Sequence, residues 1–99
     1  MKYIKKFEAS VDEIKIGEYV LLNTNSHFHT EYHDFINNNV GEVLGKDVYN
    51  IYVKYRNIPK NIEGNFDKNR IYANVKYIDK HSFDRNELEA LVASKKYNL

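Results

Sequence analysis

The sequence predicts one small domain that is mainly β, with a single helix at its C-terminal end. Two segments, residues 49–55 and 70–78, alternate apolar and polar side chains at the period of a strand. Residues 84–96 carry the start signals and the narrow apolar stripe of a surface helix. Five or six short strands with glycine-marked turns, in only 99 residues, favour a small, strongly bent β-barrel over a sandwich.

The first half of the chain carries weaker strand signals. Residues 2–8 alternate only slightly, which predicts a short edge strand. Residues 14–22 alternate more clearly, and Gly17 interrupts them, so we expect a strand that is entered through a glycine turn. Residues 40–45 predict another strand, in which Gly41 marks a point where the backbone bends or packs closely.

Residues 27–38 leave two interpretations open. The aromatic residues Phe28, Tyr32 and Phe35 fall near helical spacing, which predicts a short helix. The helix propensity of this segment is low, so an irregular loop fits it equally well.

Residues 49–55 and 70–78 form the clearest strands. Ile58-Pro59 ends the first of them, because proline has no N–H to donate within a sheet. The predicted inward residues are Tyr49, Ile51, Val53 and Tyr55 in the first strand, and Ile71, Ala73, Val75 and Tyr77 in the second.

The C-terminal helix has recognisable start signals. Asp84 is a favourable N-cap, and Glu87 three residues later completes a capping box. Phe83 before the cap is placed to pack against Leu88 as a hydrophobic staple. The apolar stripe is narrow, so we expect the helix to lie on the sheet. The predicted core comprises Ile14, Ile16, Val20, Leu22, Val43, Ile51, Val53, Ile71, Val75, Leu88 and Leu91.

The composition narrows the class of protein. The chain is 42% hydrophobic and 29% charged, with a formal net charge of +1, so overall charge indicates no particular partner. The absence of cysteine excludes disulfides, thiolate catalysis and zinc fingers. No apolar run is long enough to cross a membrane, and residues 1–8 lack the apolar stretch of a secretory signal. We therefore expect a cytoplasmic protein with no membrane partner.

Three segments follow one another in a familiar order: residues 15–22 (KIGEYVLL), 39–45 (NVGEVLG) and 49–55 (YNIYVKY). Together they resemble the SH3-like barrels of the KOW type over roughly residues 14–78, with Glu18 where these domains usually have aspartate. The resemblance implies one SH3-like barrel over residues 1–99. The segment of about 18 residues between the first two strands departs from the minimal pattern.

The ends of the chain carry a second resemblance. Residues 1–8 (MKYIKKFE) and 95–99 (KKYNL) are similar to the ends of small tailed-phage proteins. This resemblance implies a viral protein that acts in the cytoplasm of a bacterial host cell or in a virion.

A histidine cluster is the main candidate for chemistry. His27, His29 and His33 fall close together, with Glu31 and Asp34 among them, and imidazole and carboxylate groups bind zinc, iron and nickel. The spacing also resembles part of the first metal motif of the cupins, but the second motif has no counterpart. We expect a polar loop and no cofactor. Metal binding, or a gain of positive charge near pH 6, stays as an alternative.

The outward residues of the two clearest strands form the candidate binding surface. From Lys54 to Lys80 there are seven Lys/Arg against three Asp/Glu, and the second half of the chain is its basic half. Aromatic rings between cations suit single-stranded nucleic acid, and tyrosine and arginine also anchor protein interfaces. A solvated face without a partner is the third possibility. The candidate residues are Tyr52, Lys54, Arg56, Arg70, Tyr72 and Lys76.

No catalytic pattern is present in the sequence. It contains neither a Gly-x-Ser-x-Gly elbow nor a glycine-rich phosphate loop, and we expect no enzyme activity. The leading prediction is a viral binding module that engages a protein partner, for example as an inhibitor of a host or defence factor. Nucleic-acid binding through the same surface is the second prediction and metal binding the third. The sequence leaves the partner's identity and the oligomeric state open.

Overall fold

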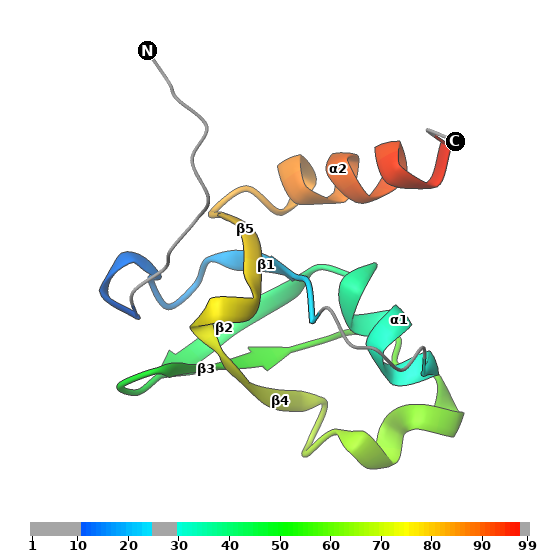
Figure 1. Cartoon of the computed structure of the whole chain (residues 1–99), viewed down its shortest axis with the longest axis horizontal. Helices are drawn as coiled ribbons and strands as arrows, with labels where there is room; N and C mark the ends of the chain where they lie inside the picture. The colour runs from blue at the N-terminus through cyan, green and yellow to red at the C-terminus, as the bar shows by residue number, and fades with distance from the viewer. Residues whose placement is uncertain (1–10, 25–29, 98–99) are drawn as a thin grey trace.

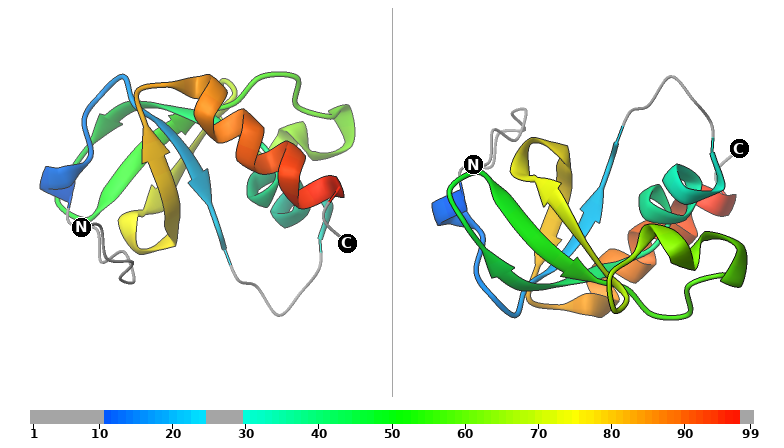
Figure 2. Two further views of the ribbon diagram at one scale, coloured as in Figure 1. Left: turned by 90° about the horizontal axis from the view of Figure 1, so that it is seen from above. Right: turned by 90° about the horizontal axis from the view of Figure 1, so that it is seen from below.

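The computed structural model describes residues 11–24 and 30–97, and it contains one antiparallel sheet in the strand order β4-β3-β2-β1-β5 (Figure 1). Helix α2 lies across β1 and β5, and α1 packs beside β1 (Figure 2). The fold is therefore mainly β with a C-terminal helix, as predicted. The elements are η1 (Val11–Glu13), β1 (Tyr19–Leu22), α1 (Glu31–Asn37), β2 (Gly41–Lys46), β3 (Asn50–Lys54), η2 (Lys60–Asn65), β4 (Arg70–Asn74), η3 (Val75–Tyr77), β5 (Ile78–Ser82) and α2 (Arg85–Tyr97), where η denotes a 3-10 helix.

The predicted strands agree with the structure most closely in the middle of the chain. Strands β2 and β3 fall within a residue of the predicted bounds. Residues 31–37 adopt the helical alternative, because the side chain of Thr30 caps α1 by accepting a hydrogen bond from the His33 N–H. The predicted edge strand at residues 2–8 lies outside the described residues. None of the described helices has the length and apolar character needed to cross a membrane.

The predicted strand at residues 14–22 is wrong in its first half. Residues 11–13 form η1, and β1 begins only at Tyr19. Gly17 has a φ of +99°, which turns the chain, and its N–H donates to the Val43 carbonyl at 3.0 Å. Ile16 is consequently 60% exposed and does not join the core. The alternation of Ile14 and Ile16 therefore does not indicate a strand, because the turn at Gly17 follows directly.

The predicted strand at residues 70–78 is divided into two strands. The Asn74 side chain accepts a hydrogen bond from the Lys76 N–H at 2.9 Å, and this local bond starts η3. The chain then continues as β5, which pairs with β1 at the far end of the sheet. Strand β5 was not predicted, because its central residues, Asp79, Lys80 and His81, are polar or charged and show no alternation.

Helix α2 begins as predicted but with different partners. Asp84 Oδ1 accepts from the Asn86 N–H at 3.0 Å, which confirms the cap. In the predicted capping box the Glu87 carboxylate accepts a hydrogen bond from the Asp84 N–H. In the structure this N–H donates instead to Ser82 Oγ at 2.9 Å. Phe83 is exposed, so the predicted staple is wrong.

The buried apolar residues form two clusters, one on each side of β1. Leu21 points away from the main core and packs with Leu88 and Val92 of α2. Leu91, predicted to be buried, faces outward on that helix, and Tyr49 is exposed at the β2–β3 turn. Ile71 is partly buried against the main core. That core consists of Ile14, Val20, Leu22, Ile36, Val43, Ile51, Val53, Tyr55, Val75 and Ile78.

Gly41 is the point of closest approach in the main core. A methyl group at this position would clash with Val53 Cγ1 and would lie 2.9 Å from Tyr55 Cζ. The Tyr55 side chain is therefore packed directly over the β2 backbone, where it is only 1% exposed. The sequence predicted close packing at Gly41, and the structure confirms it.

The Tyr55 ring is the centre of an aromatic cluster that connects α1 to η2. Phe35 of α1 and Phe66 after η2 lie edge-to-face against it, with ring centroids 5.7 and 6.1 Å away. Its hydroxyl is buried without a hydrogen-bond partner among the described residues. Burial, and secondarily the Tyr32 hydroxyl, raises the pKa of Tyr55 above the ordinary tyrosine range.

We predict that Gly41→Ala lowers the free energy of unfolding by at least about 2 kcal/mol, because a rigid core cannot absorb the added methyl group. Gly64→Ala is the matched control, since nothing lies within 4 Å of a methyl group at that position. Its effect should stay within about 1 kcal/mol. Urea unfolding of both variants measures the difference. Equal effects at the two positions would contradict the packing of Tyr55 over β2.

We predict that Tyr55→Phe does not destabilise the protein at neutral pH, because it removes a buried, unpartnered hydroxyl. Above about pH 10 the unfolded chain releases the Tyr55 proton while the folded chain keeps it, so stability is lost as pH rises. The Phe variant should lack this loss, about 1.4 kcal/mol per pH unit. Unfolding free energies between about pH 8 and 11, with exposed Tyr49→Phe as control, test this. A large loss for Tyr55→Phe at neutral pH would contradict it.

Candidate functional site

The outward face of β3 and β4 brings four of the six predicted site residues together. Tyr52 and Tyr72 are directly opposite each other across the two strands, and so are Lys54 and Arg70. The two tyrosine rings pack against each other with centroids 4.7 Å apart. They remain 41% and 52% exposed. We call these four residues the β3–β4 face.

The other two predicted residues lie outside this group. Arg56 follows the end of β3 and is exposed. Lys76 lies in η3, because the Asn74 turn ends β4 before it, and its ammonium is 5.2 Å from the centroid of the Tyr77 ring. The prediction that Lys76 shares a strand face with Arg70 and Tyr72 is therefore wrong.

A polar network holds Tyr72 in place. Its hydroxyl donates a hydrogen bond to Asp47 Oδ2 and accepts one from Asn50 Nδ2 at 3.2 Å. The bond from Tyr72 lowers the pKa of Asp47, and the same bond raises the pKa of Tyr72. Asp47 Oδ1 also accepts from the Tyr49 and Asn50 backbone N–H groups. The β2–β3 turn thus fixes the ring orientation of Tyr72 on the face.

The face carries charges of both signs, which the strand pattern alone did not predict. Asp67 Oδ2 lies 3.7 Å from the Arg70 guanidinium. Glu42 is opposite Lys54 on β2. Acidic groups from neighbouring elements therefore offset the cations that share the face, and its surface is mixed rather than basic.

A hollow lies beside the tyrosine pair at the outer edge of β4. It has a volume of about 140 Å³ and is open to solvent on one side. Two tyrosines, one apolar residue and one residue of each charge sign line it. The lining residues are Tyr52, Asp67, Arg70, Ile71 and Tyr72.

The histidine cluster falls largely outside the described residues, since His27 and His29 are not among them. His33 lies in α1, where its Nδ1 is 2.7 Å from Thr30 Oγ1. Within residues 11–24 and 30–97, no three His, Asp or Glu side chains gather closely enough to hold a metal ion.

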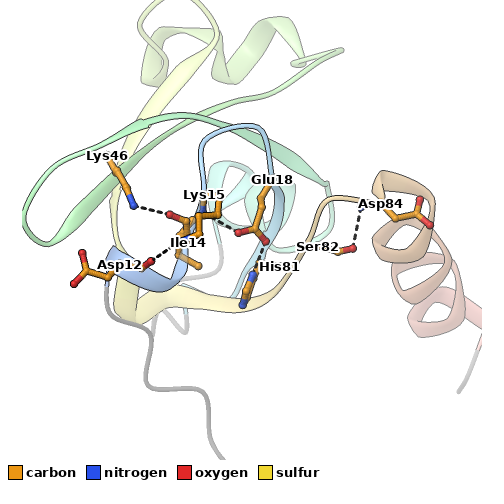
Figure 3. A network of polar contacts seen from close by, with 8 residues as sticks. All are labelled: Asp12, Ile14, Lys15, Glu18, Lys46, His81, Ser82 and Asp84. Carbon is orange, nitrogen blue, oxygen red and sulfur yellow. Dashed lines mark hydrogen bonds and ion pairs between the residues drawn. The ribbon is translucent and has the colours of Figure 1, made fainter.

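The structure reveals a buried pair that sequence reasoning missed. The Glu18 carboxylate is 4% exposed and accepts from the Lys15 N–H at 2.8 Å (Figure 3). Its other oxygen lies 2.6 Å from His81 Nδ1, which comes from β5. The one available signal was Glu18 at the position where KOW-type domains usually have aspartate. Its partner is 63 residues away in the chain, and periodicity cannot predict such a contact.

The Glu18–His81 pair connects the turn before β1 to the last strand. Lys46 secures the same segment from β2, donating to the Ile14 carbonyl at 2.8 Å (Figure 3). It also donates to the Val11 carbonyl at 3.0 Å. Both contacts add polar bonds to the apolar packing of Ile14, which is fully buried in the main core. We assign them a structural role.

Comparison with known proteins identified no relative of the chain. No protein-family model, curated protein or solved structure matches the chain. The interpretation of the β3–β4 face therefore depends on its own geometry.

We predict a coupling free energy of at least about 1 kcal/mol between Glu18 and His81 in a double-mutant cycle with alanine, because removing His81 takes a partner from the buried Glu18 carboxylate. The exposed pair Arg85–Glu89, at 3.0 Å, is the control and should give about 0.5 kcal/mol or less. Chemical unfolding of the four variants of each cycle measures both values. A Glu18–His81 coupling no larger than the control's would contradict the buried pair.

Proposed function

We propose that this chain is a small, non-enzymatic binding protein that engages a protein partner through the β3–β4 face. The observation that carries the proposal is the exposed Tyr52–Tyr72 pair beside a hollow, with Arg70 at its rim. Tyrosine and arginine are enriched among the few residues that dominate the binding energy of protein interfaces, where their large side chains become desolvated. Tyr72 is already oriented by Asp47, so binding costs little additional side-chain entropy.

The mixed charge of the face favours a protein partner over nucleic acid. A polyanion is best bound by a continuous field of positive charge, and Asp67 and Glu42 interrupt that field here. Protein interfaces commonly combine both signs around an aromatic centre. The resemblance of the chain's ends to phage proteins makes a host or defence factor the class of partner that we propose.

We also propose that the sheet curls into an SH3-like barrel that stays open between β4 and β5. Support comes from the strand order β4-β3-β2-β1-β5 and from the 3-10 turn, η3, that joins β4 to β5. Register shifts at Val43/Gly45 in β2 and Leu21/Leu22 in β1 also support the proposal, because irregularities of this kind bend a strand.

Nucleic-acid binding is the second candidate, because Lys54 and Arg70 flank rings on which bases can stack. It predicts an affinity that falls steeply with salt. An electrophoretic shift that persists unchanged in Lys54→Glu and Arg70→Glu would eliminate it.

We predict that a photo-crosslinking amino acid at position 52 captures one dominant protein adduct in cells that naturally encode the chain. Tyr72→Ala in the same chain should weaken capture about tenfold or more, as expected for an interface anchor. A crosslinker at Glu89, exposed on α2, is the control and should not give this adduct. An adduct that forms equally from both positions, or that nuclease treatment removes, would contradict a protein partner on the β3–β4 face.

A further inference from the structure

The two edges of the sheet differ in how they are protected. Strand β5 has a register shift against β1 and packs against α2. Strand β4 forms five consecutive pairs with β3 without a register shift, and it contains no proline. Bulges, prolines and covering elements are the usual means by which proteins block an edge strand. Among the described residues, strand β4 has none of these from residue 71 to residue 74, so this part of its outer edge is regular and open.

The pairing register shows which backbone groups occupy the open edge. The Tyr55 N–H donates to the Asn69 carbonyl at 2.9 Å, and the Val75 N–H donates to the Tyr49 carbonyl at 3.0 Å. In an antiparallel pair the bonded positions alternate, so Ile71 and Ala73 bond toward β3. The N–H and carbonyl of Tyr72 consequently point away from the sheet.

These two groups of Tyr72 have no backbone partner among the described residues. At the neighbouring position, Arg70 exchanges hydrogen bonds with Asp67 at 2.9 and 3.0 Å, which closes that end of the edge. The open part of the edge thus lies at Tyr72, directly beside the hollow that Tyr72, Ile71 and Arg70 line.

We propose that β4 accepts an additional strand from the protein partner. An extended segment of that partner pairs its main chain with the N–H and carbonyl of Tyr72, and one of its apolar side chains enters the hollow. This inference rests on the proposed function, since it specifies how the β3–β4 face binds its partner. It adds a recognition mode in which main-chain bonds supply affinity and the hollow supplies specificity.

The chemistry of the edge selects this occupant. The N–H and the carbonyl of Tyr72 lie on the same edge, and an opposing residue of another strand presents one acceptor and one donor to such a pair. The hollow is several times the roughly 30 Å³ that one water molecule occupies in the liquid, so it has room for a single side chain. The Tyr52 and Tyr72 rings favour an apolar one. The opposite charges of Arg70 and Asp67 at the rim offset each other, so they do not favour a charged one.

The test replaces one atom of the backbone. In one variant an ester oxygen takes the place of the Tyr72 N–H and leaves the tyrosine side chain intact. In the control the same replacement is made at Val48, an exposed residue of the β2–β3 turn. The probes are peptides of about 12 residues selected from a random library against the unmodified protein, and thermal unfolding checks that both variants fold.

We expect the selected peptides to bind the Tyr72 ester roughly tenfold more weakly than the unmodified protein, about the effect of one lost hydrogen bond, and the Val48 ester equally well. In the unmodified protein, peptide binding should slow hydrogen exchange of the Tyr72 amide at least about tenfold. These two results together support strand addition.

Three results would overturn the inference, and they separate it from the proposed function. Peptides that shift the Tyr52 and Tyr72 side-chain resonances without slowing exchange of the Tyr72 amide overturn strand addition alone. A concentration-dependent dimer that protects the same amide assigns the edge to a second copy of this chain. Binding of oligonucleotides on the face, with no peptide selected there, overturns both proposals.

Discussion

The absence of a side chain at Gly41 is the constraint on which the interior of this protein depends. Because nothing projects from the β2 backbone at that point, the Val53 and Tyr55 side chains pack directly over it. Tyr55 then presents its ring to Phe35 and Phe66, and these contacts hold α1 and η2 against the sheet. A small domain buries a limited apolar surface, so one close backbone approach determines much of its packing. The buried Tyr55 hydroxyl is the cost of placing a tyrosine at the centre.

Polar contacts supplement apolar packing in the segment before β1. The turn before β1 presents Ile16 to solvent, so that turn cannot be held by burial alone. Glu18 meets His81 from β5, and Lys46 meets two carbonyls of the same segment. A buried carboxylate requires such partners, because desolvation without them is costly. The segment before β1 is therefore connected to β5 and β2 by specific bonds between residues far apart in the chain.

The same sheet that buries Val53 and Tyr55 presents Tyr52 and Tyr72 on its other side. Alternation along β3 and the β3–β4 register place the two rings in contact, and the β2–β3 turn orients one of them through Asp47. The functional proposals come from this arrangement, which joins an oriented aromatic pair, a hollow and an open strand edge. The face carries charges of both signs, whereas a general binding surface for polyanions is uniformly positive.

The sequence by itself determined the mainly β class, the strands at residues 41–46 and 50–54, the close packing at Gly41 and the C-terminal helix. Each of these depends on local signals: alternation, glycine, and a capping aspartate. It also identified four of the residues that form the β3–β4 face, because outward positions follow from the same alternation.

Only the tertiary structure decided the division of residues 70–78 into β4, η3 and β5, the exposure of Ile16, the Glu18–His81 pair and the acidic neighbours of the face. The division follows from one side-chain hydrogen bond, at Asn74, that overrides the strand period. The other features depend on contacts between distant segments, and a periodic pattern contains no information about which segments meet. Whether a surface is basic or mixed is decided in the same way, by the residues that other elements bring to it.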